Sequence, residues 1–110
     1  MTETLKILGQ ACPSASTPGQ LYAVPGSVAA VLSRLVICNQ NSSIAKARVW
    51  ALKSGDTLGT TQYLVWDMAL VPGDPPGEVL AGFTIATGDA LWVQSDIGGV
   101  SFNAVGSEVG

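Results

Sequence analysis

The chain has 110 residues, which is enough for one domain and too few for two full ones. Charged residues make up 12% of it, about half the usual share, while 47% are hydrophobic. A domain this small cannot bury so many apolar side chains by itself, so we expect it to self-associate or to dock on a larger assembly. A net charge of −3 with five cations excludes an extended basic surface for nucleic acid.

The sequence carries no membrane or export signal. Residues 28–38 form the longest apolar run, but Ser33 and Arg34 interrupt it and it is too short to span a bilayer. The N-terminus has no basic segment followed by an apolar one, so no secretory signal is expected. Cys12 and Cys38 are too few for a disulfide framework, and we expect two reduced thiols.

The first half of the chain predicts short strands that alternate with turns. Residues 1–20 are interpreted as an extended N-terminal segment, a possible arm, that leads into a domain over 21–110. A strand over 21–24 stops at Pro25-Gly26, a pair typical of a type II turn. Residues 28–38 are apolar on both faces, which favours a central strand, and 39–43 have the composition of a turn.

The second half continues in the same way. Its expected strands are 45–53, 62–71, 78–82, 83–85, 90–94 and 100–105. About eight strands with turns every 8–12 residues indicate an all-β protein. We therefore predict one compact antiparallel β-sandwich, jelly-roll-like in its connections.

The strand expected over 45–53 raises the question of function. Its small residues (Ala45, Ala47, Val49 and Ala51) alternate with Lys46, Arg48, Trp50 and Leu52. The first set is suited to a packed core, since side chains of a strand alternate between its two faces. The second set combines cations with large apolar groups, and we expect it to contact a neighbouring sheet or subunit.

Catalytic constellations are missing from the sequence. There is no histidine to act as a general base or metal ligand. Asp74, Asp89 and Asp96 stand beside Gly or Pro in expected turns, where aspartate accepts backbone hydrogen bonds. No catalytic residue and no cofactor are predicted. Calcium in the loop 73–78 or at Ser95-Asp96 and a small carboxylate hydrolase remain as alternatives.

Trp50, Trp66 and Trp92 all fall on expected strands. Exposed tryptophans on a sheet can stack on sugar rings, which would make this a glycan-binding module. Tryptophans also supply large contact areas between sheets or subunits, and this interpretation is favoured here. Trp66 alternates with Leu64 and Met68, so we expect its face to be buried.

Most of the chain after residue 20 resembles small virion proteins of tailed bacteriophages, including those that infect cyanobacteria. The segments that carry the resemblance are LYAVPG (21–26), VICN (36–39), AKARVWA (45–51), QYLVWD (62–67), LVPGD (70–74), ATGDALWV (86–93) and VSFNAVGSE (100–108). The resemblance implies a β-sandwich subunit present in many copies in a virion assembled in the host cytoplasm. It implies no catalysis.

The sequence thus favours a non-enzymatic virion structural protein, first of all a capsid decoration (cement) protein. The expected partners are further copies of the chain, with a trimer favoured, and the major capsid protein or other virion proteins. Alternatives are a tail, neck or baseplate component and, from another class, the glycan-binding module. The residues predicted to form the interface are Lys46, Arg48, Trp50, Leu52, Trp66 and Trp92.

Overall fold

The computed structural model describes residues 2–72, 77–80 and 82–110, with the backbone alone over 77–80. Within these residues the chain forms strands and turns, and it has no helix that could cross a membrane. The strands are β1 (Glu3–Ala11), β2 (Gly19–Ala23), β3 (Ala29–Asn39), β4 (Ala45–Leu52), β5 (Tyr63–Leu70), β6 (Gly77–Leu80), β7 (Phe83–Ile85), β8 (Ala90–Ser95) and β9 (Val100–Val109).

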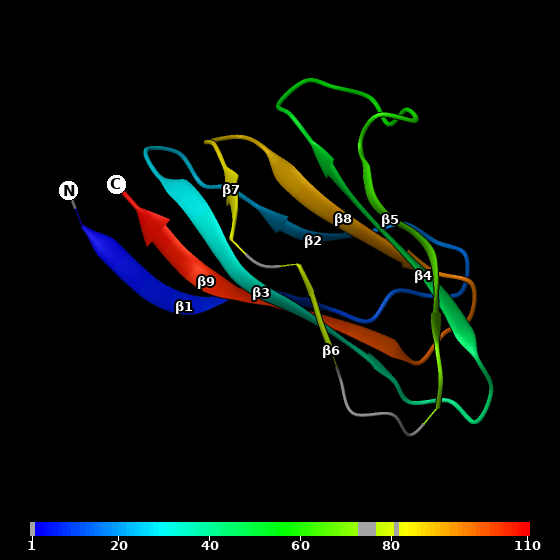
Figure 1. Ribbon diagram of the computed structural model, residues 1–110. Coiled ribbons are helices and arrows are strands. Elements are labelled where there is room, and N and C mark those ends of the chain that lie inside the picture. The colour runs from blue at the N-terminus through cyan, green and yellow to red at the C-terminus, as the bar shows by residue number, and fades with distance from the viewer. Residues whose placement is uncertain (1, 73–76, 81) are drawn as a thin grey trace.

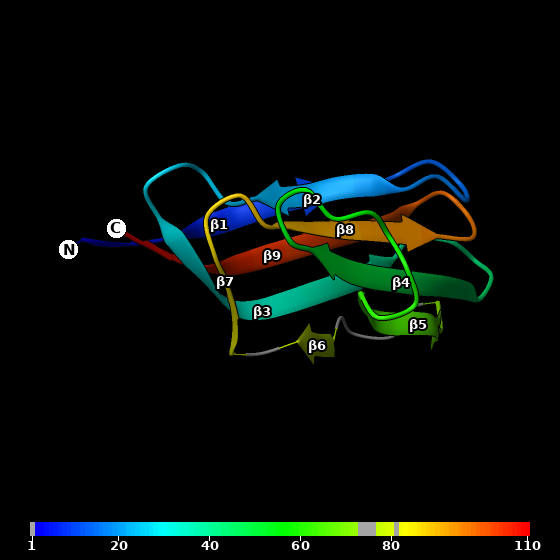
Figure 2. The ribbon, with the colours of Figure 1, turned by 90° about the horizontal axis from the view of Figure 1, so that it is seen from above.

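Two antiparallel sheets pack face to face (Figures 1 and 2). Sheet A has the order β1-β9-β3-β6, with β7 also paired to β3, and sheet B has the order β2-β8-β4-β5. β6 and β7 lie end to end along β3 and act as one interrupted strand. Counted in this way, consecutive strands lie alternately in the two sheets, except that β4 and β5 are both in sheet B. This is the connection pattern of a jelly roll. The predicted all-β sandwich is confirmed.

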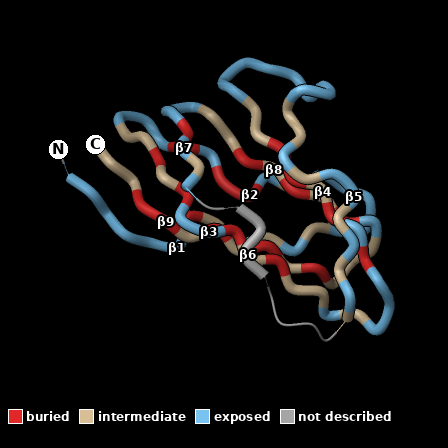
Figure 3. Tube along the Cα trace, viewed as in Figure 1, coloured by how far each residue is buried: buried red, intermediate tan, exposed pale blue. Residues whose placement is uncertain are grey.

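The core lies between the sheets and follows the period-two alternation of their strands (Figure 3). Ala45, Ala47 and Val49 of β4 are fully buried, as their spacing predicts. Opposite them, sheet A contributes large inward side chains, among which Phe102 and Leu35 have no exposed surface. Burying each large side chain contributes about 1.5–3 kcal/mol. The core therefore explains why β4 presents small residues to one side.

The N-terminal segment is part of both sheets, which corrects the expected boundary at residue 20. β1 pairs with β9 over almost its full length, and the boundary falls inside β2, which pairs with β8. A Cβ at Gly9 would lie 2.0 Å from the carbonyl oxygen of Leu21. Glycine is therefore required where β1 of one sheet meets β2 of the other. The possible arm is a strand that the chain holds in its own sandwich.

A polar network joins the sheets beside this point. The Tyr22 hydroxyl donates to Glu108 Oε2 at 2.5 Å, and Lys6 Nζ lies 3.1 Å from Glu108 Oε1. Burial, and then the bond to Glu108, raises the pKa of Tyr22. The bonds from Tyr22 and Lys6 hold the pKa of Glu108 below its ordinary value. The network ties β2 to β9 and β1.

Candidate functional site

Three aromatic side chains form a row across the outer face of sheet B. Trp50 of β4 is the register partner of Trp92 of β8 on one side and of Tyr63 of β5 on the other. Its ring centroid lies 5.5 Å from that of Tyr63, with the planes tilted by 58°. Trp50 is only 2% exposed, while Trp92 is half-buried. The chain itself therefore covers Trp50, which has no surface left for a second subunit.

A bulge in β5 shapes the neighbouring row. Val65 pairs with Val49 and Met68 pairs with Ala47, so Arg48 alone faces two residues, Trp66 and Asp67. Asp67 accommodates the extra residue with a φ of 49°, a left-handed conformation that aspartate tolerates better than most residues. Val65 and Met68 both pack on the core although they are three positions apart.

This bulge explains why the expected burial of Trp66 is wrong. The alternation of Leu64, Trp66 and Met68 assumed a regular strand, in which all three would share one face. Met68 packs against the core, but Leu64 is 37% and Trp66 58% exposed. The inserted residue changes the face that the strand presents, because side chains on either side of a bulge no longer alternate in step.

Arg48, Tyr63, Trp66 and Asp67 form a compact group that we call the aromatic–arginine cluster. Arg48 Nε donates to Asp67 Oδ1 at 2.6 Å and Arg48 Nη2 to Asp67 Oδ2 at 3.2 Å. The guanidinium carbon of Arg48 lies 3.8 Å from the Trp66 ring centroid. Tyr63 meets Trp66 edge to face with centroids 4.6 Å apart. Arg48 is thereby fixed by a two-pronged ion pair and a cation–π contact.

The charges of the cluster are matched within the chain. The hydrogen bonds from Arg48 lower the pKa of Asp67, and those to Asp67 raise the pKa of Arg48. Asp67 is therefore a carboxylate at neutral pH and is not available as a proton donor. Arg48 belongs to the face that we expected to contact a neighbouring sheet or subunit, and its carboxylate partner in this structure is Asp67 of the same chain.

Two hollows flank the cluster. One, of about 300 Å³, is lined by Thr60, Tyr63 and Trp66. The other, of about 130 Å³, is polar and lies between the cluster and the loop after β8. Its lining residues are Ser16, Lys46, Arg48, Asp67, Gln94, Ser95 and Asp96. An exposed aromatic ring beside polar groups provides a surface on which a sugar or an apolar side chain could stack.

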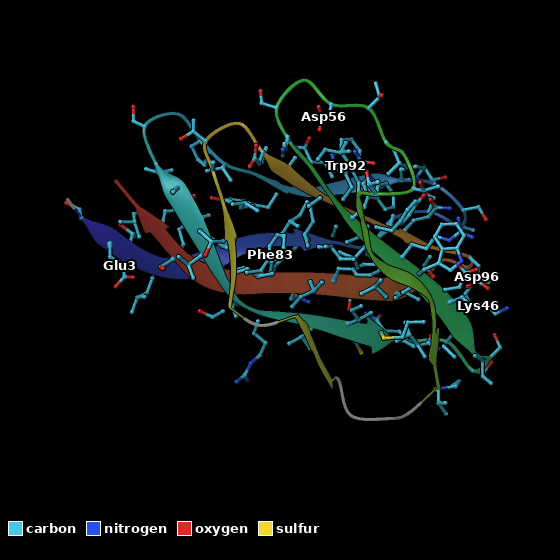
Figure 4. The ribbon with its side chains drawn as sticks, turned by 45° about the horizontal axis from the view of Figure 1, so that its top comes forward. Glu3, Lys46, Asp56, Phe83, Trp92 and Asp96 are labelled. Atoms are coloured by element: carbon cyan, nitrogen blue, oxygen red, sulfur yellow. The ribbon has the colours of Figure 1, made fainter. Side chains whose placement is uncertain are left out.

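Lys46 lies at the end of the polar hollow. Its backbone N–H donates to Asp96 Oδ1 at 2.8 Å, and Asp96 N–H donates back to the carbonyl of Lys46 at 3.1 Å. Figure 4 shows both residues at the same end of sheet B. The Lys46 side chain is exposed, so it is one of the predicted interface residues that remains accessible.

Leu52 lies at the other end of β4, away from the cluster. It is half-buried and lines a cleft of about 380 Å³ between the two sheets. β7 contributes Phe83 and Ile85 to this cleft, and Asp56 lies on the loop at its mouth (Figure 4). The six predicted interface residues are therefore divided: Lys46, Arg48 and Trp66 share the accessible outer face, Trp92 is half-buried, Trp50 is buried, and Leu52 faces the cleft.

The described residues contain no group of three or more histidine, cysteine, aspartate or glutamate side chains arranged to hold a metal ion. The loop 73–78, considered for calcium, has its acidic side chains outside the described residues. Asp96, the other candidate, uses one carboxylate oxygen to accept the Lys46 N–H. Asp89 similarly accepts backbone N–H groups of Ser54 and Ala86. These aspartates fit the turn role that the sequence predicts.

Sequence reasoning missed a second exposed surface, on β1. Leu5 is 79% and Ile7 56% exposed on the outer face of sheet A. The register places Ser107 and Val31 beside Leu5, and Val105 beside Ile7. The alternation of Leu5 and Ile7 with Thr4 and Lys6 is the sequence signal for this face. Residues 1–20 were interpreted as a segment outside the domain, so the alternation was not used.

No family model matches the chain, and neither a curated protein nor a solved structure shows significant similarity to it. The fold and the two exposed surfaces are therefore the structural basis for considering function.

Proposed function

We propose that the chain is a non-enzymatic structural subunit of a bacteriophage virion, first of all a decoration protein that docks on the capsid shell. The observation that carries this proposal is the exposure of large apolar side chains on the outer faces of both sheets, with Leu5, Ile7 and Trp66 each more than half exposed. Exposed apolar surfaces of this kind mark interaction sites. A subunit that must contact several neighbours needs more than one of them.

Three further features support the proposal. The sequence resembles small phage virion proteins, as described above. Jelly rolls occur among viral capsid domains, although this is an analogy at the level of fold and does not determine function. Asp67, Asp89 and Asp96 accept hydrogen bonds from Arg48 or from backbone N–H groups, which favours a structural role for these three side chains.

Quantitative mass spectrometry of purified particles from the source tests the proposal directly. The number of copies of this chain per copy of the major shell protein is the quantity to measure. A ratio near one, or a simple fraction of it, supports decoration of the shell. A far smaller ratio places the chain in the tail, neck or baseplate. Its absence from the particles would overturn the virion assignment.

The glycan-binding module is the second candidate, because the structure exposes Trp66 beside a hollow that Tyr63 and Thr60 also line. One face of the Trp66 ring carries Arg48, so a sugar would have to stack on the remaining surface. A glycan array with the unmodified chain and with Trp66→Ala tests this. Binding that is lost in Trp66→Ala and kept in Ile44→Ser, a change at another exposed apolar residue, would support it. An array without signal would exclude it for the glycans tested.

A further inference from the structure

β1 is the outermost strand of sheet A and pairs with β9 on one side only among the described strands (Figures 1 and 2). At its start, the N–H and carbonyl of Thr2 both bond to Gly110, at 2.9 Å each. Because bonded and unbonded pairs alternate along an antiparallel ladder, Thr4 and Lys6 also direct their backbone groups to β9. Glu3, Leu5 and Ile7 therefore direct their N–H and carbonyl groups away from the sheet.

Over residues 3–7, ahead of a register irregularity between Ile7 and Gly9, this open edge lacks the protection that edge strands normally have. Residues 3–7 keep a regular register, contain no proline and have exposed side chains throughout. An edge lysine would ordinarily repel an incoming strand, but Lys6 Nζ is held by Glu108 at 3.1 Å. The outer strand of sheet B differs, since β5 departs from regular register twice along β4. β2, at the other edge of sheet B, is also irregular between Gln20 and Tyr22.

We propose that β1 pairs antiparallel with β1 of a second copy around a two-fold axis at Leu5. Each Leu5 then faces the other Leu5, Glu3 faces Ile7, and Thr4 faces Lys6. All three residues with outward backbone groups find partners, which gives roughly six inter-chain hydrogen bonds. Directly opposite residues also share a face, as antiparallel pairing requires. The two A sheets become one continuous sheet.

The neighbouring registers are less favourable. A two-fold axis at Lys6 would set two lysines directly opposite each other, which is destabilising. An axis at Thr4 would pair Glu3 with Leu5 but leave the outward backbone groups of Ile7 without a partner among the described residues. Of these three registers, only the axis at Leu5 pairs the outward groups of Glu3, Leu5 and Ile7 with one another and opposes no like charges. It also joins the exposed side chains of Leu5 and Ile7 into one apolar surface across both copies, backed by Val31 and Val105.

This pairing goes beyond the proposed function, because it follows from the geometry of β1 whether or not the chain belongs to a virion. It also differs from the trimer that the sequence favoured. A two-fold contact is isologous, so each residue of the contact meets its counterpart from the other copy in a reciprocal way. This reciprocity provides a direct test.

Sedimentation equilibrium of the full chain under reducing conditions measures the association. The exposed thiol of Cys12 makes the reductant necessary. We expect the unmodified chain to form a dimer, and Leu5→Lys and Leu5→Glu each to weaken the dimer by at least about tenfold in Kd. An equimolar mixture of the two variants should form a mixed dimer, because Lys and Glu then face each other. Val71→Lys introduces the same charge at an exposed apolar residue outside β1, and it should leave the Kd of the dimer unchanged.

Cross-linking provides a second test that does not depend on charge. In a Cys12→Ser background, Leu5→Cys should form a disulfide between two copies on oxidation, while Thr4→Cys should not, because Thr4 faces Lys6 of the other copy. Circular dichroism checks that each variant is folded, which we expect because Leu5 is 79% exposed.

Several results would overturn the pairing. These are a wild-type chain that sediments as a monomer at high concentration, a trimer, or Leu5→Lys and Leu5→Glu variants that fail to combine. Particle composition is independent of all three. A monomer found in particles would refute the pairing and leave the virion assignment standing, and a dimer missing from particles would do the reverse.

Discussion

The edge strands β1 and β5 show two ways in which a small sandwich deals with apolar residues that its core cannot hold. At β5 the chain inserts a bulge, which places Trp66 and Asp67 together on Arg48. At β1 the chain keeps a regular register over residues 3–7, before an irregularity between Ile7 and Gly9, and leaves Leu5 and Ile7 exposed. The difference indicates that the side chains at the irregular β5 edge find contacts mainly within the chain. The regular part of β1, residues 3–7, is suited to pairing with a second chain.

The largest loss of stability is expected on substitution of Trp50, the β4 residue against which Tyr63 of β5 packs. Trp50→Ala removes a side chain that is 2% exposed and packed on Tyr63. We expect it to lower the free energy of unfolding by about 3–5 kcal/mol. Chemical denaturation measures the loss. Trp66→Ala, at a position that is 58% exposed, is the matched control and should cost far less. Similar losses for both would show that the two tryptophans are equally important to the fold.

Gly9 anchors the β1 side of the comparison. A Cβ there meets the Leu21 carbonyl oxygen at 2.0 Å, so Gly9→Ala must push β1 away from β2. We expect a loss of about 1–3 kcal/mol in denaturant unfolding. Gly26→Ala is the control, because a Cβ at Gly26 has no neighbour within 4 Å and the residue has no positive φ. An unchanged midpoint for Gly9→Ala would mean that the sheets separate easily at this point.

These residues also show how much the sequence could predict. The alternation of Ala45, Ala47 and Val49 predicted the core face of β4 correctly, because β4 lies inside the sheet with a partner strand on each side. At β5 the same reasoning was wrong for Trp66. A bulge depends on how two strands pair. The pattern of residues 62–71 alone therefore does not predict that Asp67 adopts a positive φ.

The candidate surfaces were predictable to a similar extent. Arg48 and Trp66 were named together as interface residues, and the structure brings them into contact. Their partner Asp67 was missed as part of the group, because ion pairs between strands follow from register. Trp50 was placed on the correct outer face, but its burial depends on Tyr63, which lies 13 residues later in the chain. Burial by a neighbouring strand cannot be read from alternation alone.

The bulge at β5 can be tested through the backbone of Asp67. Asp67→Val places a β-branched residue at a φ of 49° and also removes the ion pair with Arg48. We expect the melting temperature to fall by about 5 °C. Asp67→Asn keeps a side chain that tolerates this conformation and removes only the charge, so it should have a smaller effect, as exposed ion pairs contribute little. If Asn and Val were equally harmful, the charge and not the backbone would determine the bulge.

The smallest expected effect concerns acid, and it distinguishes the polar contacts behind β1 from those at β5. Glu108 and Asp67 both have a pKa below the ordinary value, through Tyr22 and Lys6 in one case and through Arg48 in the other. A carboxylate with a lowered pKa in the folded state contributes stability above its unfolded pKa, near 4.5 for glutamate, and this contribution is lost as the pH falls through the folded value. We therefore expect the melting temperature to decrease as the pH falls below about 4.5.

Glu108→Gln separates the two contributions. It cannot gain a proton in this range, so its melting temperature should be lower than that of the unmodified chain at pH 7 and should fall less steeply in acid. Asp67→Asn should likewise flatten the acid response, but by less, since Asp67 is more exposed than Glu108. Thermal unfolding by circular dichroism between pH 7 and about pH 3 measures both slopes. If Asp67→Asn flattened the acid response more than Glu108→Gln, the charges at β5 would contribute more to stability than those behind β1. That result would reverse this part of the comparison.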